Sequence, residues 1–127
     1  MYPTDRRYSK EHEWVRVDEG VVTVGITDFA QDQLGDIVYV ELAEEGKDVQ
    51  AGDVIGTIES VKAVSEIYAP VAGKVVAVNS DLDGNPELVN SDPHGDGWYC
   101  KISLADSSVV DSLMDASAYQ EFVEQSE

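Results

Sequence analysis

Residues 56–79 read GTIESVKAVSEIYAPVAGKVVAVN, and this stretch decides the fold. Two β-prone runs, residues 54–59 and Val64–Tyr68, are separated only by the four residues Ser60-Val61-Lys62-Ala63. Strand-forming runs this close together in sequence are typical of an antiparallel β-hairpin. The pattern therefore predicts a hairpin with Lys62 at or beside its tip.

Upstream of this hairpin, the sequence predicts a second hairpin followed by a short helix. Residues 13–26 alternate apolar and polar side chains around Asp18-Glu19-Gly20, which is typical of two strands joined by a tight turn. Thr27-Asp28 then offers helix-capping oxygens, apolar residues follow at helical spacing, and Gly35 suits a C-terminal stop. We therefore expect a helix near residues 28–34.

The remaining pattern predicts one domain, residues 1–127, that is mainly β with small helices. Further strands are expected at 36–42, 74–78 and 98–104, whereas residues 79–97 are dense in Asp, Asn, Gly and Pro and are expected to be mostly loop. Residues 1–10 are expected to form an N-terminal arm, and helical periodicity predicts one or two helices in a C-terminal segment, 105–127. Many short strands with Gly-rich turns indicate a small β-sandwich or flattened barrel.

The charge balance excludes one class of function and leaves two interpretations of the acidic surface. The net charge is −18, from 26 Asp and Glu against 8 Lys and Arg, so the surface repels the phosphates of nucleic acid. The acids are scattered along the whole chain. This favours a solvated coat of the kind halophiles use over an acidic face for basic partner enzymes, and the two are compatible.

Membrane, secretory, metal and nucleophile signals are absent from the sequence. No apolar run approaches the ~20 residues of a membrane-spanning helix, and the opening MYPTDRRYSK lacks a secretory apolar segment. The single cysteine, Cys100, excludes an intramolecular disulfide, so we expect a cytoplasmic protein. With Cys100, the distant His12 and His94 give no ligand spacing for zinc. We expect Cys100 to fill core space, and we expect no catalytic residue.

Lys62 is the residue whose surroundings point to chemistry. Of the five lysines, it alone lies between two β-prone runs, and the small residues Ser60 and Ala63 leave it unobstructed. An ammonium group presented in this way is a target for acylation. From spacing alone, an exposed turn lysine without a function remains the more ordinary interpretation.

The residues around Lys62 resemble the lipoyl-attachment segment of the glycine cleavage H-protein family, with Glu59-Ser60-Val61-Lys62-Ala63 at the centre of the likeness. Further runs resemble that family in order and spacing, namely His12-Glu13-Trp14-Val15, Val24-Gly25-Ile26-Thr27-Asp28, Ala30-Gln31, Leu34-Gly35-Asp36, Asn85-Pro86-Glu87-Leu88-Val89-Asn90 and Gly97-Trp98. The likeness extends from about Tyr8 to Phe122. It implies a lipoyl-domain-like β-sandwich with lipoic acid bound covalently, as lipoamide, to Lys62.

Two related carriers also present a lysine on a hairpin of a β-sandwich, and their tips differ from this one. Lipoyl domains of 2-oxoacid dehydrogenases resemble Asp-Lys-Ala and biotin carboxyl carriers resemble Met-Lys-Met, whereas Lys62 lies between Val61 and Ala63. Neither class accounts for His12-Glu13-Trp14 or for the helical C-terminal segment.

The resemblance implies a carrier that catalyses nothing alone. Such a carrier shuttles the aminomethyl group of glycine from a pyridoxal-phosphate glycine decarboxylase to a folate-dependent aminomethyltransferase and is reoxidised by dihydrolipoamide dehydrogenase. A lipoylating enzyme is the further partner, and we expect a monomer. Two alternatives stay open at this point: a lipoyl relay to 2-oxoacid dehydrogenases and a non-lipoylated structural or interaction module.

The resemblance also implies a cleft in which the loaded arm rests. By matching position, Glu13 and Glu66 are the expected contacts for the cationic amine of the loaded arm, since a carboxylate suits an ammonium. The family more often has aspartate where Glu66 stands. Phe29 occupies a position where other members often carry histidine, so a polar contact from that position is lost in this chain.

Overall fold

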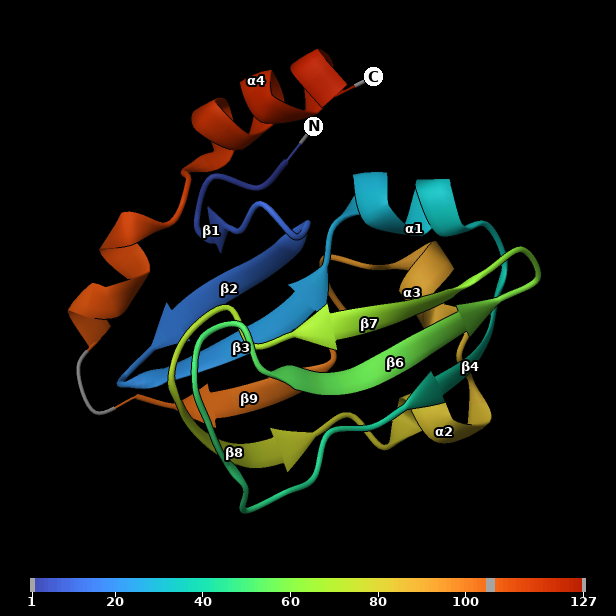
Figure 1. Ribbon diagram of the computed structural model, residues 1–127, viewed down its shortest axis with the longest axis horizontal. Coiled ribbons are helices and arrows are strands. Elements are labelled where there is room, and N and C mark those ends of the chain that lie inside the picture. Colours follow the sequence, from blue (N-terminus) through green and yellow to red (C-terminus); the bar gives the residue numbers. More distant parts are fainter. Residues whose placement is uncertain (1, 105–106, 127) are drawn as a thin grey trace.

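The strands form two antiparallel sheets that share one hydrophobic core (Figure 1). The computed structural model describes residues 2–104 and 107–126. The larger sheet has the order β1-β2-β3-β9-β8-β5, and its strands are β1 (Arg7–Tyr8), β2 (Glu13–Asp18), β3 (Val21–Ile26), β9 (Cys100–Ser103), β8 (Gly73–Val78) and β5 (Asp48–Val49). The smaller sheet has the order β4-β6-β7, and its strands are β4 (Ile37–Glu41), β6 (Val54–Ser60) and β7 (Val64–Tyr68). The two sheets are not closed into a barrel, and the mainly β sandwich expected from the sequence is confirmed.

The first hairpin and the short helix lie where their local signals predict them. Strands β2 and β3 are joined through Glu19 and Gly20, whose φ angles are 51° and 81°, the left-handed values that a tight hairpin turn uses. Helix α1 (Asp28–Leu34) begins after Thr27, whose hydroxyl accepts a hydrogen bond from the Ala30 N–H. It ends at Gly35, where φ is 80°.

Four short elements differ from the sequence expectation. Residues 79–97, expected to be mostly loop, contain the helices α2 (Asp81–Gly84) and α3 (Leu88–Ser91). Each is a single turn, too short to show a helical period in the sequence. Strand β5 was not expected, and strand β1 lies inside the segment expected to be an N-terminal arm, where it pairs with β2. Two-residue strands are likewise too short to show alternation.

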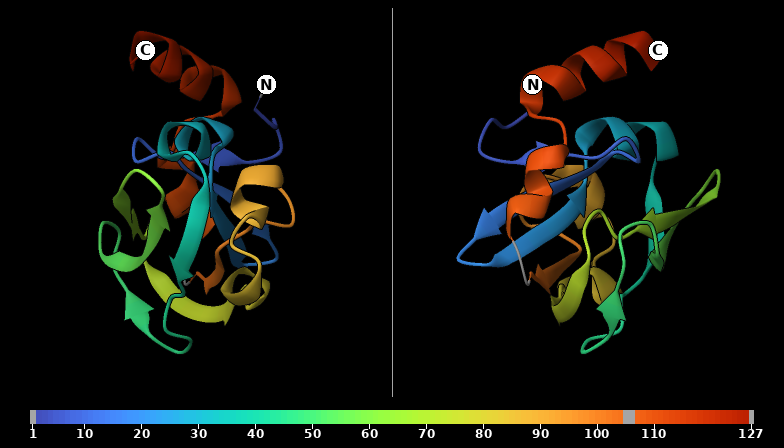
Figure 2. Two further views of the ribbon diagram at one scale, coloured as in Figure 1. Left: turned by 90° about the vertical axis from the view of Figure 1, so that its right-hand side faces the viewer. Right: turned by 60° about the vertical axis from the view of Figure 1, so that its left-hand side comes forward.

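The C-terminal segment is helical, as expected, and packs beside the N-terminal strand. It contains a 3₁₀-helix, Ser107–Ser112, and helix α4 (Ala116–Ser126). Between them, Met114 forms a two-way backbone bridge with Tyr8, with N···O distances of 2.8 and 2.9 Å. Figure 2 shows α4 lying across one end of the molecule, close to the N-terminal segment. Among the described residues, no helix is long and apolar enough to cross a membrane.

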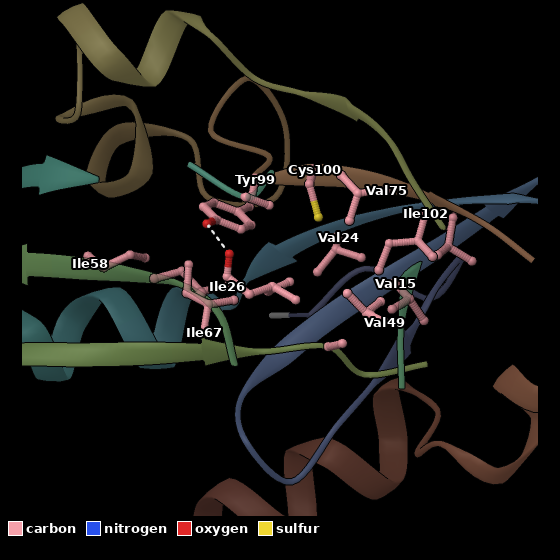
Figure 3. Packing of buried hydrophobic residues seen from close by; sticks show 14 of the residues in the cluster. Val15, Val24, Ile26, Val49, Ile58, Ile67, Val75, Tyr99, Cys100 and Ile102 are labelled. Atoms are coloured by element: carbon pink, nitrogen blue, oxygen red, sulfur yellow. Dashed lines mark hydrogen bonds between the residues drawn. The ribbon is translucent and has the colours of Figure 1, made fainter. Parts of the chain in front are cut away.

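Tyr99 connects the two sheets through the core. Its hydroxyl donates a hydrogen bond to the Glu41 carbonyl at 2.6 Å and lies 3.3 Å from the Ile55 carbonyl, so the residue before β9 reaches both β4 and β6. Figure 3 shows Tyr99 beside Cys100 among the aliphatic side chains of both sheets. Cys100 is fully buried, as expected for a core thiol, and burial raises its pKa to about 12.

A second, aromatic cluster packs α4 against the larger sheet. Its buried members are Tyr8, Trp14, Tyr119 and Val123. The Tyr119 hydroxyl lies 2.7 Å from Thr27 Oγ1 and 2.8 Å from His12 Nδ1. Helix α4 is therefore hydrogen-bonded to Thr27, which caps α1, and to His12, which lies in the loop before β2.

Candidate functional site

The turn that carries Lys62 is organised by the hydroxyl of Ser60. Ser60 is buried, and its Oγ accepts hydrogen bonds from the N–H groups of Lys62 and Ala63 at 3.2 and 3.1 Å. The same hydroxyl donates to the Ala63 carbonyl at 3.2 Å, and the Ser60 N–H donates to that carbonyl at 2.8 Å. A serine side chain that bonds nearby backbone groups holds a turn in one conformation. The tip of the β6–β7 hairpin is therefore ordered.

The Lys62 side chain is exposed and lies over Gly35. Residues Val61, Lys62, Ala63 and Val64 are all exposed, so the tip presents its side chains to solvent. A Cβ atom built on Gly35 would lie 3.2 Å from Lys62 Cε and 3.8 Å from Nζ, which places the lysine stem against a residue without a side chain. The tip projects from the body of the molecule, with the end of α1 beside it (Figures 1 and 2).

Glu13 is buried and contacts both sheets. One carboxylate oxygen accepts a hydrogen bond from the Ser9 hydroxyl at 3.1 Å, and the other accepts from the Tyr68 N–H at 2.8 Å. Burial raises the pKa of Glu13 to about 8, although these two hydrogen bonds oppose the rise. Burial therefore favours the protonated form of this carboxyl group more than in an exposed glutamate.

Tyr68 joins the two glutamates that the sequence analysis selected. Its N–H contacts Glu13, and its hydroxyl donates a hydrogen bond to Glu66 Oε1 at 3.2 Å. Glu66 itself is exposed on β7. Sequence reasoning missed Tyr68, although a residue two positions after Glu66 on a strand lies on the same face, which was the available signal.

A cavity of about 420 Å³ lies beside the buried glutamate. The residues that line it are Ser9, Lys10, Glu11, Glu13, Ala51, Gly52, Tyr68, Ala69 and Pro70. Glu13 and Tyr68 are thus in its wall, and Glu66 is connected to it through the Tyr68 hydroxyl. Apolar, acidic and basic groups line one open cavity that is large enough for a slender chain.

The remaining residues singled out from the sequence lie elsewhere. Phe29, on α1, packs against the aromatic cluster, with its ring centroid 4.8 Å from that of His12. It is therefore placed with the α4 contacts rather than in the lining of the 420 Å³ cavity. His12 has a structural position through its hydrogen bond to Tyr119, and His94 Nε2 accepts from the Asp28 N–H at 3.1 Å.

Fold and site together define a class: a two-sheet β protein with the lipoyl-domain-like fold that presents a lysine at a hairpin tip. The structure of a glycine cleavage system H protein from Mycobacterium marinum is similar, with a TM-score of 0.86, 37% identity and 98% of each chain covered. The model of the glycine cleavage H-protein family matches residues 6–126. The chain therefore belongs to this family, the lipoyl-bearing carrier of the glycine cleavage system.

Curated relatives agree with this assignment over nearly their full lengths. The glycine cleavage system H protein of Parvibaculum lavamentivorans is 57% identical, covering 95% of this chain and 97% of the relative. That of Thermotoga maritima is 52% identical, covering 94% and 97%. The assignment favours the glycine cleavage carrier over the relay to 2-oxoacid dehydrogenases and over a non-lipoylated module.

Proposed function

We propose that Lys62 carries the lipoyl group through an amide bond to its Nζ atom. The observation that carries this proposal is the exposed lysine on an ordered hairpin tip, where Ser60 fixes the turn and the neighbouring side chains leave the amine accessible. The hairpin tip fits a lipoyl group, because acylation needs an accessible amine and the long arm needs free space around it, and the exposed tip provides both. When bound, the lipoyl group supplies a disulfide that accepts a one-carbon unit and is then reoxidised.

The chain itself contributes position rather than chemistry. An arm fixed at Lys62 reaches each partner at an effective concentration that a free cofactor would not have. An ordered tip reduces the conformational entropy lost when a partner enzyme receives the arm. The carrier therefore acts as a covalently bound substrate and holds no catalytic residue of its own.

The cavity lined by Glu13 and Tyr68 is the proposed resting cleft of the arm. A cationic amine brought to Glu13 would lower the pKa of that carboxyl group, because an opposite charge favours the carboxylate. The resulting charge-assisted hydrogen bond is stronger than a neutral one. Glu66 supplies a second negative charge beside the Tyr68 hydroxyl. Phe29 contributes through packing of the adjacent His12 loop rather than by contact with the arm.

The partners follow from this function. A lipoylating enzyme modifies Lys62, a pyridoxal-phosphate glycine decarboxylase loads the carrier, a folate-dependent aminomethyltransferase unloads it, and dihydrolipoamide dehydrogenase reoxidises it. Each must receive the β6–β7 tip, so its entrance must accommodate the exposed Val61 and Val64 on either side of the lysine. The carrier is expected to act as a monomer in the cytoplasm.

Intact mass spectrometry tests the attachment site. Protein purified from its native host is expected to be heavier than the sequence mass by one lipoyl group, and a Lys62→Arg variant is expected to have the unmodified mass. Lys47→Arg is the matched control, since Lys47 is also exposed but lies outside the hairpin. An unshifted mass for the native protein, or a shift that persists in the Lys62→Arg variant, would contradict the proposal.

Reconstitution tests the pathway separately. The lipoylated chain is mixed with the decarboxylase, the aminomethyltransferase and tetrahydrofolate, and glycine-dependent one-carbon transfer to tetrahydrofolate is measured. We expect transfer with the wild type and the Lys47→Arg variant, and none with Lys62→Arg. If the lipoylated protein supports no transfer, the proposed attachment site still holds, whereas the proposed role in glycine cleavage is contradicted.

A further inference from the structure

Asn90 joins the end of α1 to the start of β4. Its Nδ2 donates hydrogen bonds to Gln31 Oε1 and to the Gly35 carbonyl, each at 2.9 Å, and its Oδ1 accepts from the Ile37 N–H at 2.8 Å. The carbonyls at the C-terminal end of a helix lack helical partners, and the Gly35 carbonyl obtains one here from α3. One carboxamide thus fixes the chain on both sides of Asp36.

The segment fixed by Asn90 is the one that the lysine turn contacts. The Asp36 carbonyl accepts a hydrogen bond from the Val61 N–H at 3.0 Å, immediately before Lys62. The stem of Lys62 lies over Gly35, as the 3.2 Å approach of a built Cβ to Cε shows. Backbone and side chain of the turn therefore both rest on Gly35 and Asp36.

We propose that Asn90 is a positioning residue for the acylation of Lys62: by holding Gly35 and Asp36 it keeps the hairpin tip, and the amine it presents, in one orientation. This inference rests on the proposed lipoylation of Lys62. Asn90 itself contacts neither Lys62 nor the acyl donor. Its effect passes through the Gly35 contact and the hydrogen bond between Asp36 and Val61.

The chemistry of acylation explains why the orientation of the hairpin tip affects the KM for the carrier. The lysine amine, after losing its proton to solvent, attacks the carbonyl of an activated lipoyl donor formed by the lipoylating enzyme from lipoate and ATP. A C–N amide bond forms, and the bond to the leaving group breaks with its electron pair. If the tip adopts the competent orientation only part of the time, the KM for the carrier rises by the inverse of that fraction while kcat is unchanged.

The test compares Asn90→Ala with the matched control Asn79→Ala. Asn79 is also an asparagine whose Nδ2 donates to two backbone carbonyls, those of Asp96 and Trp98, both at 2.8 Å, in the connection between β8 and β9. Both variants lose comparable hydrogen bonds, and only Asn90 contacts the Gly35–Asp36 segment. A third variant, Asn90→Asp, keeps the acceptor for the Ile37 N–H and loses both donors, so it serves if the alanine variant does not fold.

Two measurements are made on folded protein. Amide hydrogen exchange of Val61 is measured on the unmodified chain, and the kinetics of Lys62 acylation are measured with a purified lipoate–protein ligase, lipoate and ATP. In Asn90→Ala we expect Val61 exchange and the KM for the carrier each to rise roughly fivefold, the factor that corresponds to losing one ordinary net hydrogen bond. The kcat is expected to be unchanged, Asn79→Ala is expected to match the wild type, and Asn90→Asp is expected to lie between.

Equal Val61 exchange and equal KM in the Asn90 and Asn79 variants would overturn the positioning role. A fall in kcat with unchanged KM would overturn it as well, because it would indicate direct participation in the reaction. A wild-type chain that takes up no lipoyl group at Lys62 would contradict the proposed function instead. The two failures are distinguishable because Val61 exchange does not depend on modification.

Discussion

The carboxyl group of Glu13, on β2, accepts a hydrogen bond from the N–H of Tyr68, on β7, at 2.8 Å. This contact joins the larger sheet to the smaller one beside the proposed resting cleft. Glu13 is only 2% exposed, in a chain whose other acids are mostly on the surface. Burial of an ionisable group so close to the proposed cargo site makes both stability and cleft charge depend on pH.

The first prediction concerns the pH dependence of stability. The pKa of Glu13 rises from an ordinary 4.5 to about 8 on folding, so the folded state holds a proton that the unfolded state releases. The resulting stabilisation is complete below pH 4.5, declines as the pH rises and is lost above about pH 8. Glu13→Gln keeps a neutral group at this position and is expected to flatten this part of the profile. Urea unfolding from pH 5 to 9 measures the difference between the two proteins.

The control for this prediction is Glu66→Gln, which removes an exposed carboxyl group from the same region. We expect its stability profile to run parallel to that of the wild type between pH 5 and 8, because this variant keeps the buried carboxyl group of Glu13. Parallel profiles for wild type and Glu13→Gln would show that Glu13 ionises normally in the folded protein, contrary to the prediction.

Local signals made the hairpins and the first helix predictable. A capping threonine, a terminal glycine and apolar spacing lie within one short segment, so α1 and its ends could be deduced from residues 27–35 alone. The same holds for the hairpin around Lys62, whose two strands are separated by four residues. Elements of this kind need no knowledge of distant contacts.

The contacts that build the site depend on residues far apart in the chain. Glu13 and Tyr68 are 55 positions apart, as are Gly35 and Asn90, and no local pattern links either pair. In a chain with 26 acids, nothing in the sequence alone marks Glu13 as a buried one. The role of Tyr68 as the bridge between Glu13 and Glu66 likewise became visible only with the sheet pairing.

The second prediction concerns the turn that carries the lysine. Ser60→Ala removes a hydroxyl that accepts from the N–H groups of Lys62 and Ala63. Because these N–H groups can turn to water once released, the expected loss is about 1 kcal/mol in the free energy of unfolding. Faster amide exchange at both residues is expected as well. The control is Ser65→Ala on β7, whose side chain has no hydrogen bond within the described part of the chain, and equal exchange in the two variants would contradict the role of Ser60.

The third prediction concerns the contact between Gly25 and Trp14. A Cβ at Gly25 would lie 2.6 Å from the Trp14 ring, which cannot retreat because its Nε1 donates to the Pro93 carbonyl at 2.9 Å. Gly25→Ala is expected to lower the free energy of unfolding by roughly 1–3 kcal/mol through overpacking. Gly84→Ala is the matched control, since a Cβ there meets nothing within 4 Å. Urea unfolding followed by tryptophan fluorescence measures both, and equal stability would contradict the clash.

The last prediction concerns the acidic surface. The chain carries 26 acidic against 8 basic residues, and within residues 2–104 and 107–126 the one ion pair joins Arg6 to Asp5. Unpaired like charges repel one another in the compact state more than in the unfolded chain, so screening by salt is expected to stabilise the fold. The midpoint of thermal unfolding is expected to rise by several degrees between low salt and about 1 M KCl, where the Debye length is only ~3 Å. Sucrose is the control, because it favours the compact state without screening charge. A midpoint that rises with sucrose but not with KCl would contradict an electrostatic origin and, with it, the interpretation of the acids as a salt-adapted coat.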